Sequence, residues 1–335
     1  MTEALKKWIA PKDFYKKVFL ISVPLALQQL LNSAMGIADS MMVSWIGQVT
    51  AVGTAAQIEN LMMTVGFGVA SGAGIFMSQF FGKQDLKSEK KAFGLGVILS
   101  LINALVWMAA SVFFGRQLMR FYIPDPTVIE SALQYLMIAM ISYLPGALIT
   151  MFSFAYRCIQ KTHVPMLIGL VSMAVNIVLN YCLIFGHFGF PQMGVQGAAL
   201  ATLIAQTTGL MIHIVYAYKS KQSFIGTPRE MFALSSDFVQ PILRRAYPLV
   251  LNELFFGFGN TLYIRAFGRL GTEAMDAYYV GNQISNMFFF IVQGLNSANG
   301  AILGASLGQG DLELAKRHET GLWRWPSCCR PCRRC

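Results

Sequence analysis

The sequence predicts an all-α integral membrane protein, a polytopic helical bundle with a complete N-terminal six-helix lobe and two helices of a parallel-repeat second lobe. Three observations predict this fold. Charged residues make up only 13% of the 335 residues and hydrophobic residues 55%, so polar groups could not cover the chain in water. Long stretches lack ionisable side chains, and each exceeds the roughly 20 residues that cross about 30 Å of hydrocarbon as a helix. One part of the chain recurs further along the sequence, as expected of duplicated helices.

Eight membrane-spanning helices are predicted in order. Seven stretches lack Asp, Glu, Lys, Arg and His altogether: residues 18–38, 60–82, 92–115, 131–156, 164–186, 188–212 and 277–310. An eighth stretch, residues 246–264, is interrupted only by Glu253. These spans predict an N-terminal six-helix lobe (residues 14–218), a polar cytoplasmic linker (219–238) and the first helix pair of a C-terminal lobe (239–318).

The internal repeat relates residues 57–85 to residues 283–311. Eight positions are identical between the two copies: Gln57 and Gln283, Ile58 and Ile284, Asn60 and Asn286, Gly68 and Gly294, Ser71 and Ser297, Gly74 and Gly300, Gly82 and Gly308, and Asp85 and Asp311. Average residue usage would give roughly two matches by chance. Six predicted helices separate the starts of the copies, and an even number returns the chain to the same side. The copies are therefore predicted to be related by an axis along the membrane normal.

Basic residues orient the predicted spans. With a cytoplasmic N-terminus, the inner segments hold eighteen Lys and Arg residues and the outer ends hold four. Because basic loops stay on the cytoplasmic side, this asymmetry predicts a multi-pass protein of the inner (plasma) membrane with cytoplasmic termini. The net charge of +10 is then explained by these loops and their attraction to anionic lipid, so the lipid bilayer is an expected partner and nucleic acid is not.

The final segment, residues 319–335, differs in composition from the rest. It holds four of the six cysteines: Cys328, Cys329, Cys332 and Cys335. Adjacent cysteines fit poorly with the CxxC pairs of zinc sites, so we predict a disordered tail and no metal or other cofactor. Because only two helices of the second lobe precede this tail, we also expect the chain to be an inactive truncated form.

Asp39 is the leading candidate for a functional residue. It follows 21 residues without an ionisable group, inside the first predicted span. A carboxylate at that depth costs about 2.5 to 3.5 kcal/mol unless it is neutralised or faces water. This cost favours a functional role, such as exchanging a proton or binding Na⁺. The alternative is a helix-end aspartate that reaches the outer headgroups.

Two asparagines in the fifth span point to the same chemistry. Asn176 and Asn180 are four residues apart and so share one face of a helix. Their carboxamide oxygens, together with a hydroxyl such as that of Thr202, are hard ligands suited to Na⁺ or to holding a protonated acid. The alternative is that both asparagines only bond neighbouring helices.

Other polar residues in the spans have two interpretations each. Glu253 is either a second coupling group or a residue that faces the inner cavity or pairs with a basic group. Glu59 is predicted to be interfacial, at the outer mouth of the second span. Four residues related by the repeat are predicted to line a cleft, although repeat packing explains them equally well: Gln57, Asn60, Gln283 and Asn286.

Four segments carry a recognisable pattern: PLALQQLLNSAMGIADSMMVSWIG from Pro24, the glycine-rich second span ending in GKQD, NIVLNYCLIFG followed by GVQGAALAT, and PLVLNELFFGFGN. Together they resemble the multidrug and toxin extrusion (MATE) family of cation-coupled antiporters over about residues 14–318. The resemblance implies two six-helix lobes around a central cleft. It also implies a protein that exports cationic or amphipathic drugs in exchange for H⁺ or Na⁺. A membrane-embedded enzyme is not expected, because the spans contain no paired histidines, no HExxH motif and no acid and base pair. We expect the protein to be a monomer.

The resemblance assigns roles by motif position. Asp39 matches the first-helix acid of the family. Four residues fall in or near the cation site that this acid forms: Asn176, Asn180, Thr202 and Tyr135. Pro24 matches a position where the first helix can bend, and either a gate or a static kink is consistent with it. Many members have Asp where this chain has Asn180, and the loss of that carboxylate favours protons over Na⁺.

A lipid-linked saccharide flippase of the same superfamily is the alternative function. Such a protein is expected to carry basic residues inside the cleft, where they would hold pyrophosphate. The ionisable residues predicted to lie deep in the membrane are acidic here, which favours cations.

Overall fold

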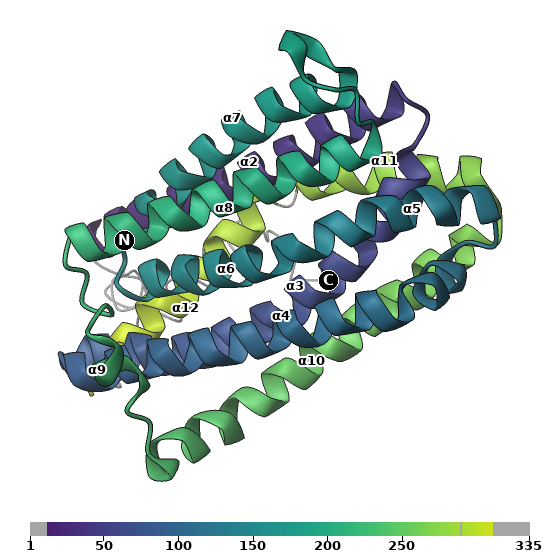
Figure 1. Ribbon diagram of the computed structural model, residues 1–335. Coiled ribbons are helices and arrows are strands. Elements are labelled where there is room, and N and C mark those ends of the chain that lie inside the picture. The colour runs from purple at the N-terminus through teal and green to yellow at the C-terminus, as the bar shows by residue number, and fades with distance from the viewer. Residues whose placement is uncertain (1–11, 289, 311–335) are drawn as a thin grey trace, which may run out of the picture.

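The computed structural model describes residues 12–288 and 290–310 (Figure 1). All regular secondary structure in these residues is helical, as predicted. The predictions for the Cys/Arg-rich tail at 319–335 lie outside the described residues.

The described part of the chain contains eleven α-helices in this order: α2 (Lys12–Ser44), α3 (Val49–Lys83), α4 (Leu86–Tyr122), α5 (Pro126–Ala139), α6 (Tyr143–Cys158), α7 (His163–Phe185), α8 (Val195–Lys219), α9 (Pro228–Phe232), α10 (Ser236–Gly268), α11 (Thr272–Phe288) and α12 (Phe290–Gly308). A short 3-10 turn, Met140–Ser142, joins α5 to α6, and another, His187–Gly189, follows α7.

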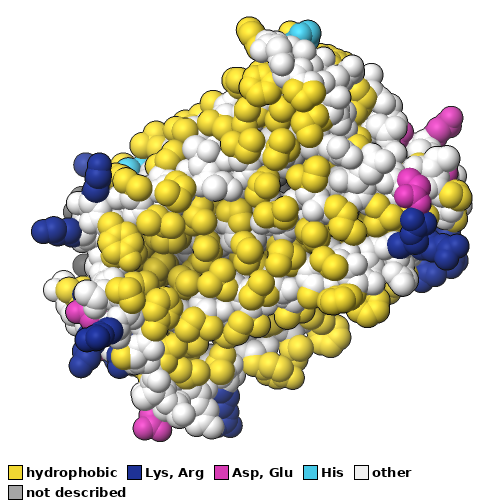
Figure 2. All heavy atoms as spheres, in the orientation of Figure 1, with side chains coloured by type: hydrophobic (Ala, Val, Ile, Leu, Met, Phe, Trp, Pro, Cys, Tyr) yellow, Lys and Arg dark blue, Asp and Glu magenta, His cyan; other side chains and the backbone are white. Residues whose placement is uncertain are grey.

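Six segments of the described chain are long and apolar enough to cross a membrane: Val18–Ser44, Val49–Lys83, Leu86–Tyr122, Pro126–Cys158, His163–Phe185 and Val195–Lys219. They correspond to the first six predicted spans. Figure 2 shows hydrophobic side chains across the middle of the visible face, with Lys and Arg gathered at its two ends. This distribution is the one a membrane-spanning bundle requires, because hydrocarbon faces the middle and water the ends.

The last two predicted spans do not reach the same hydropathy. In α10, prolines, glycines, asparagines and Glu253 interrupt the apolar residues. The final predicted span contains α11 and α12, whose polar residues include Gln, Asn and Ser. α10 has 33 residues, whereas α11 has 17 and α12 has 19, and none of the three is among the six segments named above.

One predicted boundary was wrong. The sixth span was predicted to begin at Phe188, because no charge separates this residue from the helix that follows. The structure ends α7 at Gly186, a left-handed C-cap with φ of 75°, and starts α8 only at Val195. Glycine adopts this backbone region without the clash of a Cβ atom. Because the loop before Val195 contains no charged residue from Phe188 onward, the prediction included it in the helix.

Helix α3 lies at the centre of the packing. It contacts α4, α5 and α6 on one side and α10, α11 and α12 on the other. α2 packs against both α7 and α12, so it belongs to the α2–α8 bundle and also touches the α10–α12 group. α10 lies at the edge of the molecule opposite α7 in Figure 1.

Repeat-related residues meet where α3 and α12 approach each other. A Cβ atom on Gly82 would lie 2.3 Å from the carbonyl oxygen of Ala305, and one on Gly308 would lie 2.2 Å from that of Gln79. Gln79 and Ala305 are themselves counterparts in the repeat, as are the two glycines. The two helices therefore make reciprocal contacts, as a twofold relation between repeats requires, and only glycine permits this closeness.

Candidate functional site

A chain of hydrogen bonds joins α2, α7 and α8 inside the α2–α8 bundle. Asn180 on α7 donates through Nδ2 to Oδ1 of Asp39 on α2 (2.5 Å) and to Oδ1 of Asn176 (3.1 Å). Asn176 in turn donates through Nδ2 to the hydroxyl of Thr202 on α8 (3.4 Å). Both asparagines are buried, with exposed fractions of 0% and 1%. The structure thus brings together four of the residues expected to form a cation site.

The residues come together because α2, α7 and α8 each place polar side chains where the three helices meet. α7 packs against α2 and α8, and the three lie side by side in Figure 1. Residues four apart on α7 lie above one another, so Asn180 faces Asp39 while Asn176 faces Thr202. Thr202 Oγ1 donates to the carbonyl of Ala198 on its own helix (3.1 Å), which leaves its lone pairs for Asn176.

One oxygen of this cluster has no hydrogen-bond partner. Oδ1 of Asn180 is buried and unpaired, although a buried polar atom without a partner costs about 1 to 3 kcal/mol. The oxygen belongs to the same carboxamide that contacts Asp39. An unpaired acceptor beside a carboxyl group can accept the proton of a protonated acid or contribute to binding a cation. The donor set of Asp39, Asn180 and Thr202 is therefore chemically suited to H⁺ or Na⁺.

Tyr135 lies beside the same cluster. Its side chain is buried, and its hydroxyl is within hydrogen-bonding reach of Thr202. It is also close enough to interact with the charges of Asp39 and Glu59. We call the residues Asp39, Glu59, Tyr135, Asn176, Asn180, Thr202 and Gln206 the polar chamber.

Glu59 corrects an expectation from the sequence, because it lies inside the bundle and not at the membrane interface. Its carboxylate accepts a hydrogen bond from Nε2 of Gln206 on α8 at 3.2 Å. It is near enough to interact with the charge of Asp39. The polar chamber therefore holds two carboxyl groups. Gln206 was not singled out from the sequence either, and the available signal was a glutamine inside the sixth predicted span.

Glu253 lies away from the polar chamber. It is on α10, where its Cγ would lie 3.3 Å from a Cβ atom on Gly68 of α3. None of the hydrogen bonds of the chamber includes it, and neither of the ion pairs formed by the described residues does. Its side chain therefore packs between α10 and α3, at the contact between the α10–α12 group and the α2–α8 bundle.

The remaining predicted residues occupy several places. Pro24 lies inside the continuous helix α2, fifteen residues before Asp39. Gln57 is buried and donates to the carbonyl of Gly53 at 3.3 Å. Asn60 and Asn286 are exposed, and the side chain of Gln283 is not among those described.

Comparison with known proteins decides the family. The sequence matches the MatE family over residues 24–182 and 248–323. The chain belongs to the MatE family. The match includes the residues of α2 and α7 in the polar chamber and the repeated helices, so it confirms the resemblance noted in the sequence.

Relatives of this MatE-family chain carry names of multidrug resistance proteins. A probable multidrug resistance protein NorM of Thermotoga maritima is 25% identical over 338 aligned positions, which cover 97% of this chain and 70% of that protein. The probable multidrug resistance protein NorM of Agrobacterium fabrum is 24% identical, with coverage of 89% and 65%. The probable multidrug resistance protein YoeA of Bacillus subtilis is also 24% identical, with coverage of 92% and 68%. The chain thus spans about two thirds of the length of these relatives.

Solved structures share the fold of the MatE-family chain. One is an outward-facing conformation of a multidrug resistance MATE family transporter, with a TM-score of 0.80 and 20% identity over 97% of this chain and 71% of that one. Another is MATE in the bent conformation, with a TM-score of 0.78 and 19% identity over 96% and 70%. The likeness confirms the predicted all-α integral membrane fold.

Proposed function

We propose that this protein is a secondary active antiporter that exports cationic or amphipathic compounds across the inner (plasma) membrane in exchange for H⁺ or Na⁺. The observation that carries the proposal is the hydrogen bond from Asn180 to Asp39 inside an apolar bundle. A carboxyl group at this depth is costly unless its charge is used. Membership of the MatE family and the names of its relatives support an export function.

Asp39 has different hydrogen-bonding needs in its two protonation states. As a carboxylate it only accepts, and Asn180 Nδ2 supplies a donor. As a protonated acid it must also donate a hydrogen bond. Asn180, whose Nδ2 already donates to Asp39, carries an unpaired acceptor for it, Oδ1. Rotation of one carboxamide or a small shift of α2 then satisfies either state. Uptake of a cation thus changes the contact between α2 and α7.

We assign the coupling role to the polar chamber, with Glu59 as a second carboxyl group beside Asp39. Asn180 stands where many family members have an acid, and Glu59 on α3 restores a second negative charge from another helix. Two carboxyl groups near each other favour uptake of at least one positive charge, because like charges in a dry site repel. Proton coupling remains our preference over Na⁺.

The change at Asp39 reaches the rest of the protein through α2. This helix touches α7, which carries the two asparagines, and α12 of the other helix group. Pro24 interrupts the backbone hydrogen bonds of α2 between its start and Asp39. We propose that α2 bends at Pro24 when Asp39 takes up a cation, and that the bend moves α2 against α12. The units 14–218, 219–238 and 239–318 would then act as a lobe, a linker and a second moving part, with both chain ends in the cytoplasm.

The alternative function, flipping a lipid-linked saccharide, is not favoured by the polar chamber. The two carboxyl groups in it would repel a pyrophosphate. A cation is the species that the chamber suits.

The residues to which we assign coupling lie together in the described part of the chain, so we propose transport by this chain in place of the inactivity expected from the sequence. Transport of ethidium by proteoliposomes containing the purified chain tests the proposal. We expect efflux to follow an imposed pH gradient or an imposed Na⁺ gradient, and Asp39→Asn to abolish the dependence on that gradient. Asp237→Asn is the matched control, because Asp237 is exposed in the first turn of α10. Efflux that ignores both gradients, or that persists unchanged in Asp39→Asn, would refute the proposal.

A further inference from the structure

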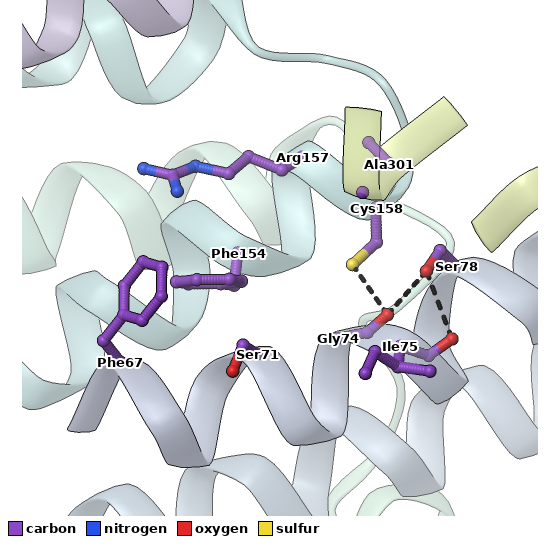
Figure 3. A pocket seen from close by; sticks show the side chains of 10 residues that line it. Phe67, Ser71, Gly74, Ile75, Ser78, Phe154, Arg157, Cys158 and Ala301 are labelled. Atoms are coloured by element: carbon purple, nitrogen blue, oxygen red, sulfur yellow. Dashed lines mark hydrogen bonds between the residues drawn. The ribbon is translucent and has the colours of Figure 1, made fainter. Parts of the chain in front are cut away.

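A cavity of about 210 Å³ lies between α3, α6 and α12 (Figure 3). Its walls are mainly apolar and include Phe67 and Ile75 of α3, Phe154 and Cys158 of α6, and Ala301 of α12. Ile75 and Ala301 are counterparts in the repeat, so the cavity sits where the two repeated helices face each other. Transporters built from repeats bind their substrates at such interfaces.

Among the described residues that line this cavity, Arg157 is the one that carries a charge. Figure 3 shows its side chain extending over the ring of Phe154, on the side toward Phe67 and away from Cys158. The guanidinium carbon lies 4.8 Å from the centroid of that ring. Side chains in helices lean toward the helix N-terminus, which directs Arg157 from the end of α6 back into the bundle. The guanidinium therefore points back along α6, over Phe154.

Among the described residues, no acidic side chain forms an ion pair with this guanidinium. Nε is buried without a hydrogen-bond partner, and one terminal nitrogen donates to Oε1 of Gln28 at 3.5 Å. Neither ion pair of the described chain involves Arg157. Arg157 as a whole is half-buried, and a partly desolvated cation without an anion is unfavourable because the hydration that it loses is not replaced.

Neighbouring polar groups of the cavity do not satisfy Arg157 either. The hydroxyl of Ser71 donates to the carbonyl of Gly68, and the hydroxyl of Ser78 donates to that of Gly74. The thiol of Cys158 also donates to Gly74, at 3.2 Å. Each of these groups is bonded to the backbone of α3, as the dashed lines of Figure 3 show for Ser78 and Cys158. No hydrogen bond joins Arg157 to any of these groups, so its remaining donors are available to a group that enters the cavity.

We infer that this cavity is a binding site for amphipathic aromatic carboxylates, with Arg157 holding the carboxylate. The fork of guanidinium N–H groups matches the two oxygens of a carboxylate, and a charged pair of this kind is stronger than a neutral hydrogen bond. Phe67 and Phe154 supply an edge-to-face aromatic wall, with ring centroids 5.1 Å apart, for the flat body of the ligand. Binding of such compounds in the cavity does not depend on the proposed function. Only the further step, that they are transported, rests on it.

The substrate class then differs from that suggested by the polar chamber. The chamber lies within the α2–α8 bundle and suits a coupling cation. The cavity lies between that bundle and α12 and suits the anionic end of a guest molecule. A compound that carries a carboxylate, alone or together with an amine, fits this division better than a simple cation.

Equilibrium binding to the purified chain in phosphatidylcholine nanodiscs tests the inference without any transport step. The probes share one aromatic body: naphthalene-2-acetate, its amide, and 2-(naphthalen-2-yl)ethylammonium. We expect the carboxylate to bind about tenfold or more tightly than the amide, as a charged hydrogen-bonded pair predicts, and the ammonium to bind least. Equal binding of the three probes by the unaltered chain would overturn the inference, and this comparison depends on no variant.

Variants locate the carboxylate. Arg157→Gln should make the carboxylate and the amide bind equally, and Arg157→Lys should retain part of the preference because the charge remains. Lys161→Gln is the matched control, since Lys161 is a nearby cation whose partner is Gln222 at 2.9 Å, away from the cavity. An unchanged preference in a folded Arg157→Gln protein would overturn the inference.

Anionic lipid is the other source of a negative group. The carboxylate affinity should not change when phosphatidylglycerol replaces part of the phosphatidylcholine. A steep fall would assign Arg157 to lipid headgroups and contradict a guest site. Because the assay measures binding alone, a negative binding result would not contradict the antiport proposal. In the same way, absence of gradient-driven ethidium efflux would not contradict a positive binding result.

Discussion

Thr50 at the start of α3 is joined to Asp276 of α11 by a hydrogen bond, in which the hydroxyl of Thr50 donates to Oδ1 of Asp276 at 2.5 Å. Thr50 also donates to the carbonyl of Thr272 at 3.3 Å. These residues lie in the first turns of α3 and α11, so the repeated helices meet at their first turns as well as at Gly82 and Ala305 near their last turns. Both ends of the interface are closed in this structure.

An antiporter that opens on alternate sides must separate one of these ends. We therefore predict that oxidation of a Thr50→Cys and Asp276→Cys double variant slows ethidium efflux, and that a thiol reductant restores it. Each single cysteine variant, oxidised in the same way, controls for the native cysteines. Full efflux with the crosslink formed would show that this end stays closed throughout transport.

Glu59 should contribute to coupling. Glu59→Gln removes the charge while its remaining carbonyl oxygen can still accept from Gln206. Because coupling free energies are typically about 1 to 3 kcal/mol, we expect gradient-driven efflux to fall roughly fivefold or more. Glu130→Gln is the matched control, since Glu130 is exposed and pairs with Arg116 at 2.6 Å near the α4–α5 turn. Equal loss in both variants would remove Glu59 from the mechanism.

The close approach of α3 and α12 predicts a stability effect. Gly82→Ala places a Cβ atom 2.3 Å from the backbone oxygen of Ala305, so the helices must move apart. We expect a loss of about 1 to 3 kcal/mol in the free energy of unfolding, as for other overpacked contacts. Thermal unfolding of the purified chain measures it.

Gly259→Ala is the control for Gly82→Ala. It lies inside α10, and a Cβ atom there meets nothing within 4 Å. Replacing a helical glycine by alanine without a clash should leave stability unchanged or raise it by about 0.4 to 1 kcal/mol. Similar behaviour of the two variants would show that the α3–α12 contact is not tight.

Asp85 gives a pH dependence outside the membrane spans. It is the N-cap of α4, and hydrogen bonds from the side chain and backbone of Ser88 hold the pKa of Asp85 below its ordinary value of 3.8. Since the folded pKa is the lower one, this carboxylate stabilises the fold above pH 3.8, and the contribution is lost as the pH falls through the folded pKa.

Asp85→Asn tests this dependence. It keeps a cap but removes the charge near the helix N-terminus, so we expect a loss of about 0.3 to 1 kcal/mol near neutral pH. The difference from the unaltered chain should shrink as both are unfolded at decreasing pH. A difference that is constant with pH would mean that the charge of Asp85 has no part in it.

Much of this arrangement was predictable from the sequence. The polar residues of α2 and α7 stood out because apolar spans surround them, and the i, i+4 spacing of Asn176 and Asn180 predicted a shared face. Hydrophobic runs located the first six spans, because lipid imposes both length and composition.

Other features depended on packing that no local pattern encodes. The direction of Glu59 depends on how α3 rotates against α8, so position along the helix alone placed it wrongly at the interface. Arg157 was counted among basic residues of the inner segments, but α6 continues to Cys158 and its side chain turns back over Phe154. In both cases a neighbouring helix decides whether the side chain meets water or protein.

Proton release on drug binding tests the central role of Asp39 most directly. The purified chain is titrated with ethidium by calorimetry in two buffers that differ in ionisation enthalpy, and the difference gives the number of protons released. We predict that the unaltered protein releases protons when ethidium binds and that Asp39→Asn, with ethidium still bound, releases fewer. Equal proton release by the two proteins would contradict the account.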